Sequence, residues 1–299
     1  NAVALWELQR ELLASNLSSK RMTNELVGLA FGALFFAGCQ SEKSNHTNTT
    51  EQAEDDKKVK FKLDGDNNSL EIETDLLGSY EFTPATPGDD SSPTGTNDAT
   101  LIGNASITTD PERGEVLSLD GNGDYAEITG LFGNPANVTL AAWVNLTAAD
   151  TQGSDVINLG DNVGIRLDNP NGGSGVWAYY YDGTTWNNIA SGQFVAGDGW
   201  VHVAYVFDDA ADTHTIYING TAINSEAATS SIVYANASNT RIGSHANGST
   251  DYDFNGLIDD ARIYTRALSA DEIAALAADQ TSDSGAVPIT VNPVNDAPV

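Results

Sequence analysis

Two glycine-rich turns carry oxygen-bearing side chains at alternate positions. The segment "DGNGDY" spaces Asp120, Asn122 and Asp124 two residues apart, and "DYDFNG" does the same with Asp253 and Asn255. Oxygen ligands at such spacing can converge on a hard cation such as calcium. The second turn is not an EF-hand, because an arginine stands where a bidentate glutamate is needed and a strand-like segment follows. The alternative interpretation is that each turn caps its own backbone.

A strand prediction for "GLIDDARIYTR" adds one more candidate ligand. Alternation places Asp259 on a face with Ala261 and Ile263, and it places Asp260 and Arg262 together on the other face as a structural pair. A half-buried Asp259 would need backbone donors or a metal. We therefore predict a structural calcium site with the candidate ligands Asp120, Asn122, Asp124, Asp253, Asn255 and Asp259.

An aromatic cluster is the most plausible ligand-binding surface in the sequence. In "VWAYYYDGTTW" a strand would present Trp177, Tyr179 and Tyr181 on one face and Tyr180 on the other, with Trp186 after the turn. Exposed aromatic rings stack on the apolar faces of sugars, while nearby Asp and Asn side chains bind hydroxyl groups. The alternative is that at least half of these rings pack in the core or on a strand face.

Catalysis is not predicted. A glycosidase needs two carboxyl groups on either side of the scissile bond, and the nearest same-face pair, Glu71 and Glu73, precedes the main domain. The sequence has no Gly-x-Ser-x-Gly elbow, His-Glu-x-x-His or phosphate loop. His202 is predicted to be a structural histidine in a strand. The other histidines, His46, His214 and His245, lie in polar segments without evident partners.

The elements that would position these residues are short strands. Nine segments of strand length alternate in character and end in Gly, Asn or Asp: "EVLSLDG", "DYAEITG", "VTLAAWVNL", "GIRLDNP", "VWAYYYDG", "WVHVAYVFDD", "HTIYINGT", "TRIGS" and "GLIDDARIY". One helix is predicted at "SADEIAALAA", where Ser269 and Glu272 complete a capping box and Ile273 and Leu276 would pack on the sandwich edge. The pattern predicts an all-β, two-sheet antiparallel sandwich with one short C-terminal helix.

The charge distribution argues against nucleic acid as a partner. Residues 1–62 carry eight of the 13 basic and eight of the 42 acidic side chains, so residues 63–299 carry five arginines, no lysine and the whole net charge of −29. Such an acidic surface repels phosphate backbones. An acidic surface can bind divalent cations, or it can serve only to keep the protein soluble.

The order of several motifs resembles a known family. "LSLDGNGDYAEI", "LAAWVNL", "GWVHVAYVFD", "TIYINGT" and "FNGLIDDARIYTRALSADEIAAL" follow one another as in the laminin-G-like jelly-roll domain of the concanavalin A-like lectin and glucanase superfamily. The resemblance covers about residues 75–280. It implies a jelly roll that serves as a binding or adhesion module, and superfamily members often hold a calcium ion.

The single cysteine suggests a membrane anchor. Lys20 and Arg21 precede an apolar run that ends in "LFFAGC", which resembles the lipobox of bacterial lipoproteins and implies lipidation of Cys39. An incidental cysteine in an ordinary signal peptide is the alternative. Residues 1–21 are an upstream extension if translation begins at Met22. The polar residues 40–74 are predicted to be a disordered tether.

The C-terminal residues 281–299 end in "VNDAPV", which resembles the junction of bacterial cadherin-like and Ig-like tandem repeats and implies further repeats. The sequence thus predicts a non-catalytic binding module that is lipid-anchored at the bacterial cell envelope, at the outer membrane or cell surface. Its ligand would be a glycan or a surface protein. The alternatives are a structural spacer of a large adhesin and an accessory module of a polysaccharide-degrading enzyme.

Overall fold

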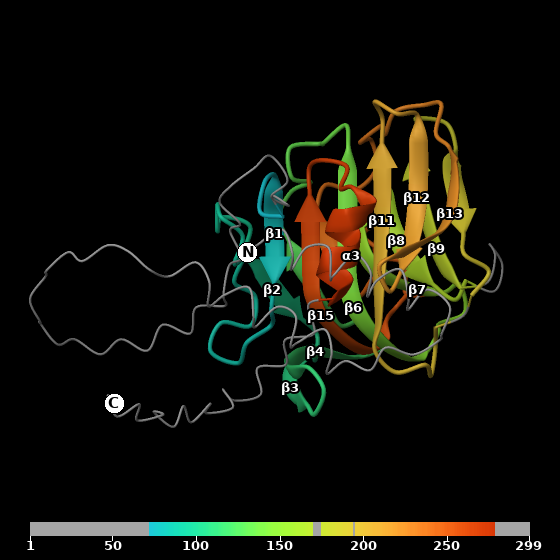
Figure 1. Ribbon diagram of the computed structural model, residues 1–299. Helices are drawn as coiled ribbons and strands as arrows, with labels where there is room; N and C mark the ends of the chain where they lie inside the picture. Colours follow the sequence, from blue (N-terminus) through green and yellow to red (C-terminus); the bar gives the residue numbers. More distant parts are fainter. Residues whose placement is uncertain (1–71, 170–174, 194, 279–299) are drawn as a thin grey trace, which may run out of the picture. The chain divides into compact units, whose positions relative to one another are not determined.

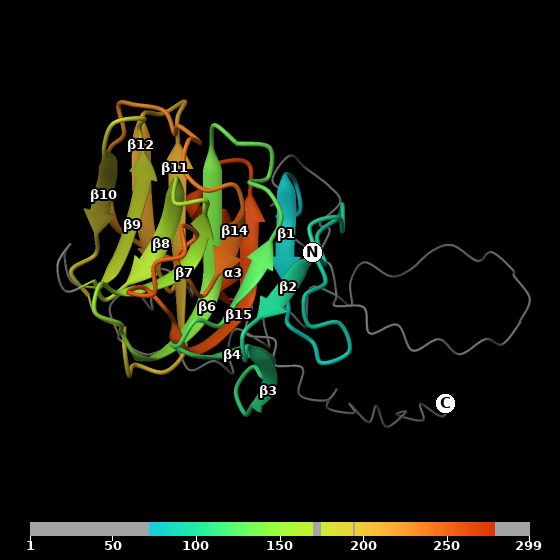
Figure 2. The same ribbon diagram turned by 180° about the vertical axis from the view of Figure 1, so that it is seen from behind.

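The computed structural model describes residues 72–169, 175–193 and 195–278, which lie within one compact unit, Lys62–Val299. Within these described residues, fifteen strands form two antiparallel sheets, as the sequence pattern predicts (Figure 1). Figure 2 shows the domain from behind the view of Figure 1, with the smaller of the two sheets toward the viewer. Cys39 and the segments 1–39 and 281–299 lie outside the described residues, as does nearly all of 40–74, so the anchor and repeat assignments stay predictions.

The larger sheet has eight strands in the order β13-β12-β11-β6-β15-β4-β3, with β1 also paired to β15. Its strands are β1 (Leu76–Tyr80), β3 (Ser106–Asp110), β4 (Gly114–Asp120), β6 (Val138–Ala148), β11 (Val201–Asp208), β12 (Thr213–Ile218), β13 (Thr221–Ala227) and β15 (Asn255–Tyr264).

The smaller sheet has seven strands in the order β10-β9-β8-β7-β14-β5-β2. Its strands are β2 (Ala99–Ile102), β5 (Tyr125–Ile128), β7 (Ser154–Leu159), β8 (Val163–Leu167), β9 (Val176–Tyr181), β10 (Trp186–Ala190) and β14 (Thr240–Ile242).

The main core lies between the two sheets and is filled by alternate residues of each strand. In β11, Val203, Tyr205 and Phe207 point into this core, while Ala204 and Val206 belong to a separate cluster on the outer face. This alternation follows from the two-residue period of a strand. The side chains on the outer face of each sheet therefore do not fill the main core and can contact other elements or a ligand.

A β-bulge in β15 overturns the predicted facing of its acidic residues. The register of β15 against β6 shifts between Asp259 and Arg262, and Asp260 has a φ of 47°. Such a bulge inserts a residue and reverses the alternation beyond it. Ala261 and Ile263 therefore face the core, whereas Asp259 lies opposite Trp143 on the outer face.

The same bulge gathers a buried ionic cluster on the outer face of the eight-stranded sheet. The Arg113 guanidinium lies 2.7 Å from a carboxylate oxygen of Asp259 and 2.7 Å from one of Asp260. Arg262 lies 3.7 Å from Asp260, which confirms that predicted pair. Arg113 also stacks over the Trp143 ring at 4.5 Å. Asp259 therefore has a guanidinium partner in this structure.

His202 belongs to the same cluster and behaves as a structural residue. Its ring packs edge-on against Trp143, with centroids 5.5 Å apart. Burial first, and the nearby Arg262 charge second, lower the pKa of His202 to about 3. The imidazole is therefore neutral at physiological pH and serves packing, as the sequence predicts.

The helix α3 (Ala270–Ala278) begins with the predicted capping box and covers a face rather than an edge. The Ser269 N–H donates to the Glu272 carboxylate at 2.8 Å, and the Glu272 N–H donates to the Ser269 hydroxyl at 3.3 Å. Ile273 and Leu276 pack on the outer face of the eight-stranded sheet (Figure 1). Their neighbours there are Ala141, Ala204, Val206, Tyr217 and Tyr264.

Candidate functional site

A tight hairpin turn between β7 and β8 places a carboxylate over the outer face of the seven-stranded sheet. The turn runs from Leu159 to Asn162, with φ angles of 63° at Gly160 and 59° at Asp161. The Asn162 N–H donates to the Leu159 carbonyl at 3.0 Å. Positive φ at both central residues is the geometry of a type I′ turn, which matches the twist of paired strands.

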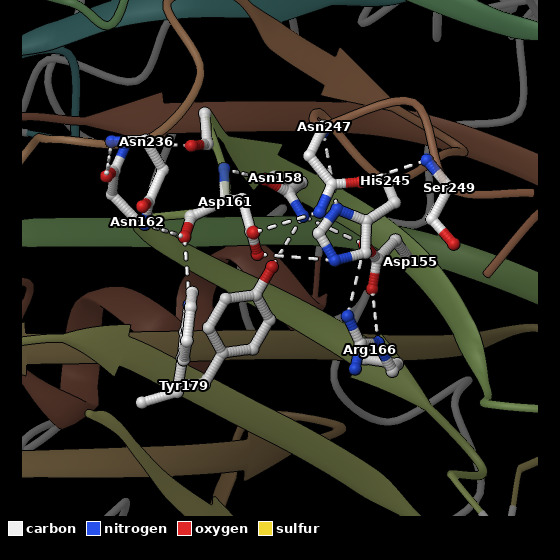
Figure 3. Close-up of polar contacts among 12 residues, drawn as sticks. Asp155, Asn158, Asp161, Asn162, Arg166, Tyr179, Asn236, His245, Asn247 and Ser249 are labelled. Carbon is white, nitrogen blue, oxygen red and sulfur yellow. Dashed lines mark hydrogen bonds and ion pairs between the residues drawn. The ribbon is translucent and has the colours of Figure 1, made fainter. Parts of the chain in front are cut away.

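Asp161 is the centre of a hydrogen-bond network that joins distant parts of the chain (Figure 3). Its carboxylate lies 3.2 Å from His245 Nε2 and accepts a hydrogen bond from Asn247 Nδ2 at 3.2 Å. Its backbone carbonyl accepts hydrogen bonds from Trp186 Nε1 at 3.0 Å and from Asn236 Nδ2 at 2.9 Å. These bonds tie the turn to β10, to the segment between β13 and β14, and to the loop between β14 and β15.

A pocket of about 340 Å³ opens beside this network. Its floor comes from β8 and β9, and its walls come from the turn, from β10 and from the loop between β14 and β15. The lining residues are Asp161, Arg166, Trp177, Tyr179, Trp186, His245, Asn247 and Tyr252. This volume is at the lower end of the usual range for small-ligand sites.

The floor of the pocket is a guanidinium surrounded by aromatic rings. Arg166 lies 3.9 Å from the centroid of the Tyr252 ring, 4.9 Å from that of Trp177 and 5.2 Å from that of Tyr179. Two of its nitrogens bond the carboxylate of Asp155, which is fully buried (Figure 3). The planar guanidinium and the rings thus fix one another in position.

Trp186 stands at the pocket with much of its ring in solvent. It is 46% exposed, and Trp186 and Val233 are the two exposed large apolar side chains among the described residues. Its indole is held on both sides, because Nε1 donates to the Asp161 carbonyl and the ring packs on Tyr181 with centroids 4.7 Å apart. An exposed ring held this way can stack on a ligand with little loss of conformational entropy.

Asp161 and His245 meet as a carboxylate and a neutral imidazole. Burial, followed by the charge of Asp155, raises the pKa of Asp161 to about 6, although Arg166 and Asn247 act in the opposite direction. Burial lowers the pKa of His245. At pH 7 Asp161 is therefore ionised and accepts a hydrogen bond from His245 Nε2–H, while His245 Nδ1 accepts one from the Asn247 N–H at 3.5 Å.

This raised pKa makes the stability effect of Asp161 depend on pH. The folded state holds the proton more tightly than the unfolded chain, whose aspartates have pKa values near 3.9. Stability therefore falls as the pH rises from about 4 through 6. We expect Asp161→Asn to add about 1 kcal/mol at about pH 8, after allowance for solvent screening, and to add almost nothing at about pH 4.

Thermal melting of the wild type and Asp161→Asn across this pH range measures the effect, and about 1 kcal/mol corresponds to roughly 2–4 °C for a domain of this size. Asp89→Asn is the matched control, because Asp89 is exposed and lies outside the pocket. A melting difference that stays constant with pH, or a less stable Asp161→Asn protein at high pH, would contradict the assignment.

The aromatic residues predicted to bind a ligand divide between the pocket and its surroundings. Trp177, Tyr179 and Trp186 line the pocket, whereas Tyr181 supports Trp186 from beside it. Tyr180 faces the core, as predicted. Trp177 is only 9% exposed and Tyr179 only 1%, so they shape the floor rather than form an open stacking surface.

The polar side of the pocket lining was not predicted from the sequence. It consists of Asp161, Arg166, Asn247 and Tyr252, and the prediction that His245 has no partner is wrong, because His245 contacts Asp161 and Tyr252. The "GDN" turn signal of residues 160–162 was present in the sequence. The contact between Asp161 and Asn247 spans 86 residues and has no local signal.

The predicted calcium ligands are mostly turn-capping groups in this structure. The Asp120 carboxylate accepts the Asn122 N–H at 3.0 Å, and the Asp124 carboxylate accepts the Asp120 N–H at 2.9 Å. The Asp253 carboxylate accepts the Gly123 N–H at 2.9 Å and the Ser244 hydroxyl at 3.0 Å. Asn255 pairs with Asp120 across the two strands.

Of these groups, the Asp124 carboxylate keeps one buried oxygen without a partner. Within residues 72–169, 175–193 and 195–278, no group of three or more His, Cys, Asp or Glu side chains is placed to hold a metal. Calcium binding stays a prediction.

Two stacked antiparallel sheets with one capping helix define a jelly-roll β-sandwich. The chain belongs to the concanavalin A-like lectin/glucanases superfamily, because the laminin-G-like family model of that superfamily matches residues 120–274. This match confirms the family resemblance of the sequence motifs. A comparison with curated proteins gave no match.

Solved structures with the same fold include several binding domains. Domain 4 of AbnA, a GH43 extracellular arabinanase from Geobacillus stearothermophilus, in complex with arabinotriose, has a TM-score of 0.56 and 22% identity over 68% of this chain and 98% of its own. The binding domain of Paraclostridial Mosquitocidal Protein 1 has a TM-score of 0.54 and 16% identity over 69% of this chain and 52% of its own.

A third structure is the binding domain of botulinum neurotoxin DC in complex with SialylT. It has a TM-score of 0.51 and 14% identity over 70% of this chain and 52% of its own. The chain thus spans about half of each of the two toxin domains. At these identities the likeness establishes the fold alone. In the described part of the chain, no helix is long and apolar enough to cross a membrane.

Proposed function

We propose that this domain is a non-catalytic carbohydrate-binding module whose glycan lies in the pocket on the outer face of the seven-stranded sheet. The observation that carries the proposal is Trp186, an exposed ring held in place beside a carboxylate, an amide and a guanidinium. The ring would stack on the apolar face of a sugar, and Asp161, Asn247 and Arg166 would bond its hydroxyl groups.

The chemistry of the lining supports binding rather than catalysis. Its one carboxylate is Asp161, whereas glycoside hydrolysis by the usual mechanism needs two carboxyl groups. The nearby Asp155 is buried and bonded to Arg166. The lining residues include no serine, cysteine or lysine, and burial raises the pKa of the Tyr179 phenol, which keeps it protonated. The Asp161–His245 pair therefore has no nucleophile to activate within the lining.

The family and its structural relatives agree with this proposal. One relative of the same fold is described in complex with arabinotriose and another with SialylT. Arabinotriose is therefore the first probe to use, followed by an array of plant and microbial oligosaccharides. The competing interpretation is that the domain is a structural spacer, which predicts that no glycan of the array binds.

Replacing the exposed ring is the direct test. We expect Trp186→Ala to weaken binding of the best array ligand by about tenfold or more, because the exposed stacking surface is lost. Titration calorimetry on the full chain measures the change. Val233→Ala is the control, because Val233 is 38% exposed but does not line the pocket.

The possible results distinguish a wrong function from a wrong binding site. If the wild-type chain binds no glycan in the array, the proposed function is wrong. If the wild type binds and Trp186→Ala binds equally well, the glycan lies elsewhere on the domain.

A further inference from the structure

All the positive charge in the described part of the chain is already paired. Residues 63–299 contain five arginines and no lysine. Each of these arginines makes an ion pair of 3.7 Å or less with a carboxylate: Arg113 with Asp259 and Asp260, Arg166 with Asp155, Arg241 with Glu127, Arg262 with Asp260, and Arg266 with Glu272. A free cation that could receive an anionic ligand is therefore missing from the described residues.

The positive charge of the pocket is paired with a carboxylate as well. Its cation, Arg166, is bonded to the buried Asp155 through Nε and Nη2, so this pair carries no net charge. His245 is neutral, because burial lowers its pKa. Asp161 is the remaining charged group of the lining, and it is ionised above about pH 6. The pocket therefore has a net negative charge at pH 7.

Further carboxylates flank two of the lining residues. Asp182 begins the turn that leads into Trp186, and hydrogen bonds from Asn187 and from Thr184 and Thr185 of that turn lower its pKa and keep it ionised. Asp251 is exposed and directly precedes Tyr252. Both carboxylates add negative charge beside residues that line the pocket.

We infer that the pocket selects uncharged glycans and rejects sugars that carry a carboxylate or sulfate, with Asp161 as the residue that sets this selectivity. The inference rests on the proposed function and names its ligand class. A sugar hydroxyl can donate to Asp161, whereas a sugar carboxylate in the same place would bring two like charges together in a partly buried site. Rejection of the wrong ligand by repulsion is a common source of specificity.

Matched pairs of oligosaccharides test this inference. Trimers of glucose, mannose and galactose are compared with the uronate trimers of the same linkages, which differ only by a carboxylate at C6. The full chain is titrated with each at about pH 8, where Asp161 is ionised, with calcium and with EDTA. We expect the affinity for each neutral trimer that binds to be about tenfold or more above the affinity for every uronate trimer. The same difference is expected for arabinotriose if it binds.

Two further measurements assign the discrimination to Asp161. The ratio of neutral to uronate affinity should shrink several-fold in Asp161→Asn, even if both affinities fall, because the repelling charge is gone. It should stay unchanged in Asp89→Asn, whose exposed side chain lies outside the pocket lining. In the wild type, salt at about 1 M should lower the ratio of neutral to uronate affinity. At this concentration the Debye length is about 3 Å, so the repulsion between carboxylates is screened.

Failure of this inference differs from failure of the proposed function. A uronate that binds as tightly as its neutral partner, with or without calcium, overturns the inference and leaves carbohydrate binding intact. An unchanged ratio in Asp161→Asn overturns the role of that residue. The absence of binding to every trimer and to arabinotriose overturns both proposals together.

Discussion

Replacing Arg166 with alanine is expected to destabilise the fold by about 3–5 kcal/mol, because it leaves the carboxylate of Asp155 buried without a counter-charge. For a domain of about 200 residues this corresponds to a fall in melting temperature of roughly 6–20 °C. The same change removes the floor of the pocket, since the guanidinium is packed against Tyr252, Trp177 and Tyr179. Urea denaturation and glycan titration measure the two effects.

Two companion variants keep the effects separate. Arg166→Lys keeps a positive charge near Asp155 but loses the planar fork and its stacking, so it should fold and bind glycan about tenfold more weakly. Arg166→Ala combined with Asp155→Asn removes both charges and should recover part of the stability without recovering binding. If Arg166→Lys binds as well as the wild type, the guanidinium does not shape the site.

Replacing Arg113 should cost as much stability but leave ligand binding unchanged. Arg113 is 5% exposed and bridges Asp259 and Asp260 on the outer face of the eight-stranded sheet, on the opposite side of the core from the pocket. Arg113→Ala leaves the buried Asp259 without its guanidinium partner and leaves Asp260 with the more distant Arg262 at 3.7 Å, so we expect a loss of about 3–5 kcal/mol at about pH 8. Urea denaturation measures it, and glycan titration confirms that the pocket is intact.

The pH dependence of this loss checks its cause. Burial, followed by the charge of Asp260, already raises the pKa of Asp259 to about 7 despite Arg113. Without Arg113 the folded state holds the Asp259 proton still more tightly than the unfolded chain does. The penalty should therefore be large above about pH 7, where Asp259 is ionised in the wild type, and should shrink as the pH falls through about 7 and Asp259 becomes protonated in both proteins.

Arg241→Ala is the matched control for Arg113. Arg241 pairs with Glu127 at 3.1 Å, but the two side chains are 16% and 28% exposed. A pair that keeps contact with water should contribute about 1 kcal/mol or less. An Arg113→Ala protein no less stable than Arg241→Ala would show that the buried cluster is not held by that guanidinium.

Strands in which apolar and polar residues clearly alternate could be predicted from the sequence. Strands without this alternation could not. The predicted segments correspond to β4, β5, β6, β8, β9, β11, β12, β14 and β15. The strand β7, "SDVINL", is buried at every position and so lacks an alternating pattern. β10 and β13 are polar strands at the sheet edges, where no apolar face is required.

The aromatic half of the candidate site could be predicted, but the polar half could not. Trp177, Tyr179 and Trp186 lie within one hairpin, so strand alternation alone places them near one another. Asp161 depends on the missed strand β7, and His245 and Asn247 come from a loop more than 80 residues away. The bulge at Asp260 reversed the facing of β15, and no residue type in the sequence marks it.

The described part of the chain begins and ends on the sheet that does not carry the pocket. β1 joins the eight-stranded sheet through β15, and α3 lies on the outer face of that sheet. Anything coupled to residues 72 or 278 is therefore attached on the side of the domain opposite the pocket. An affinity resin or sensor chip linked at either point should hold the proposed glycan site toward the solution, which is the orientation that an immobilised capture reagent needs.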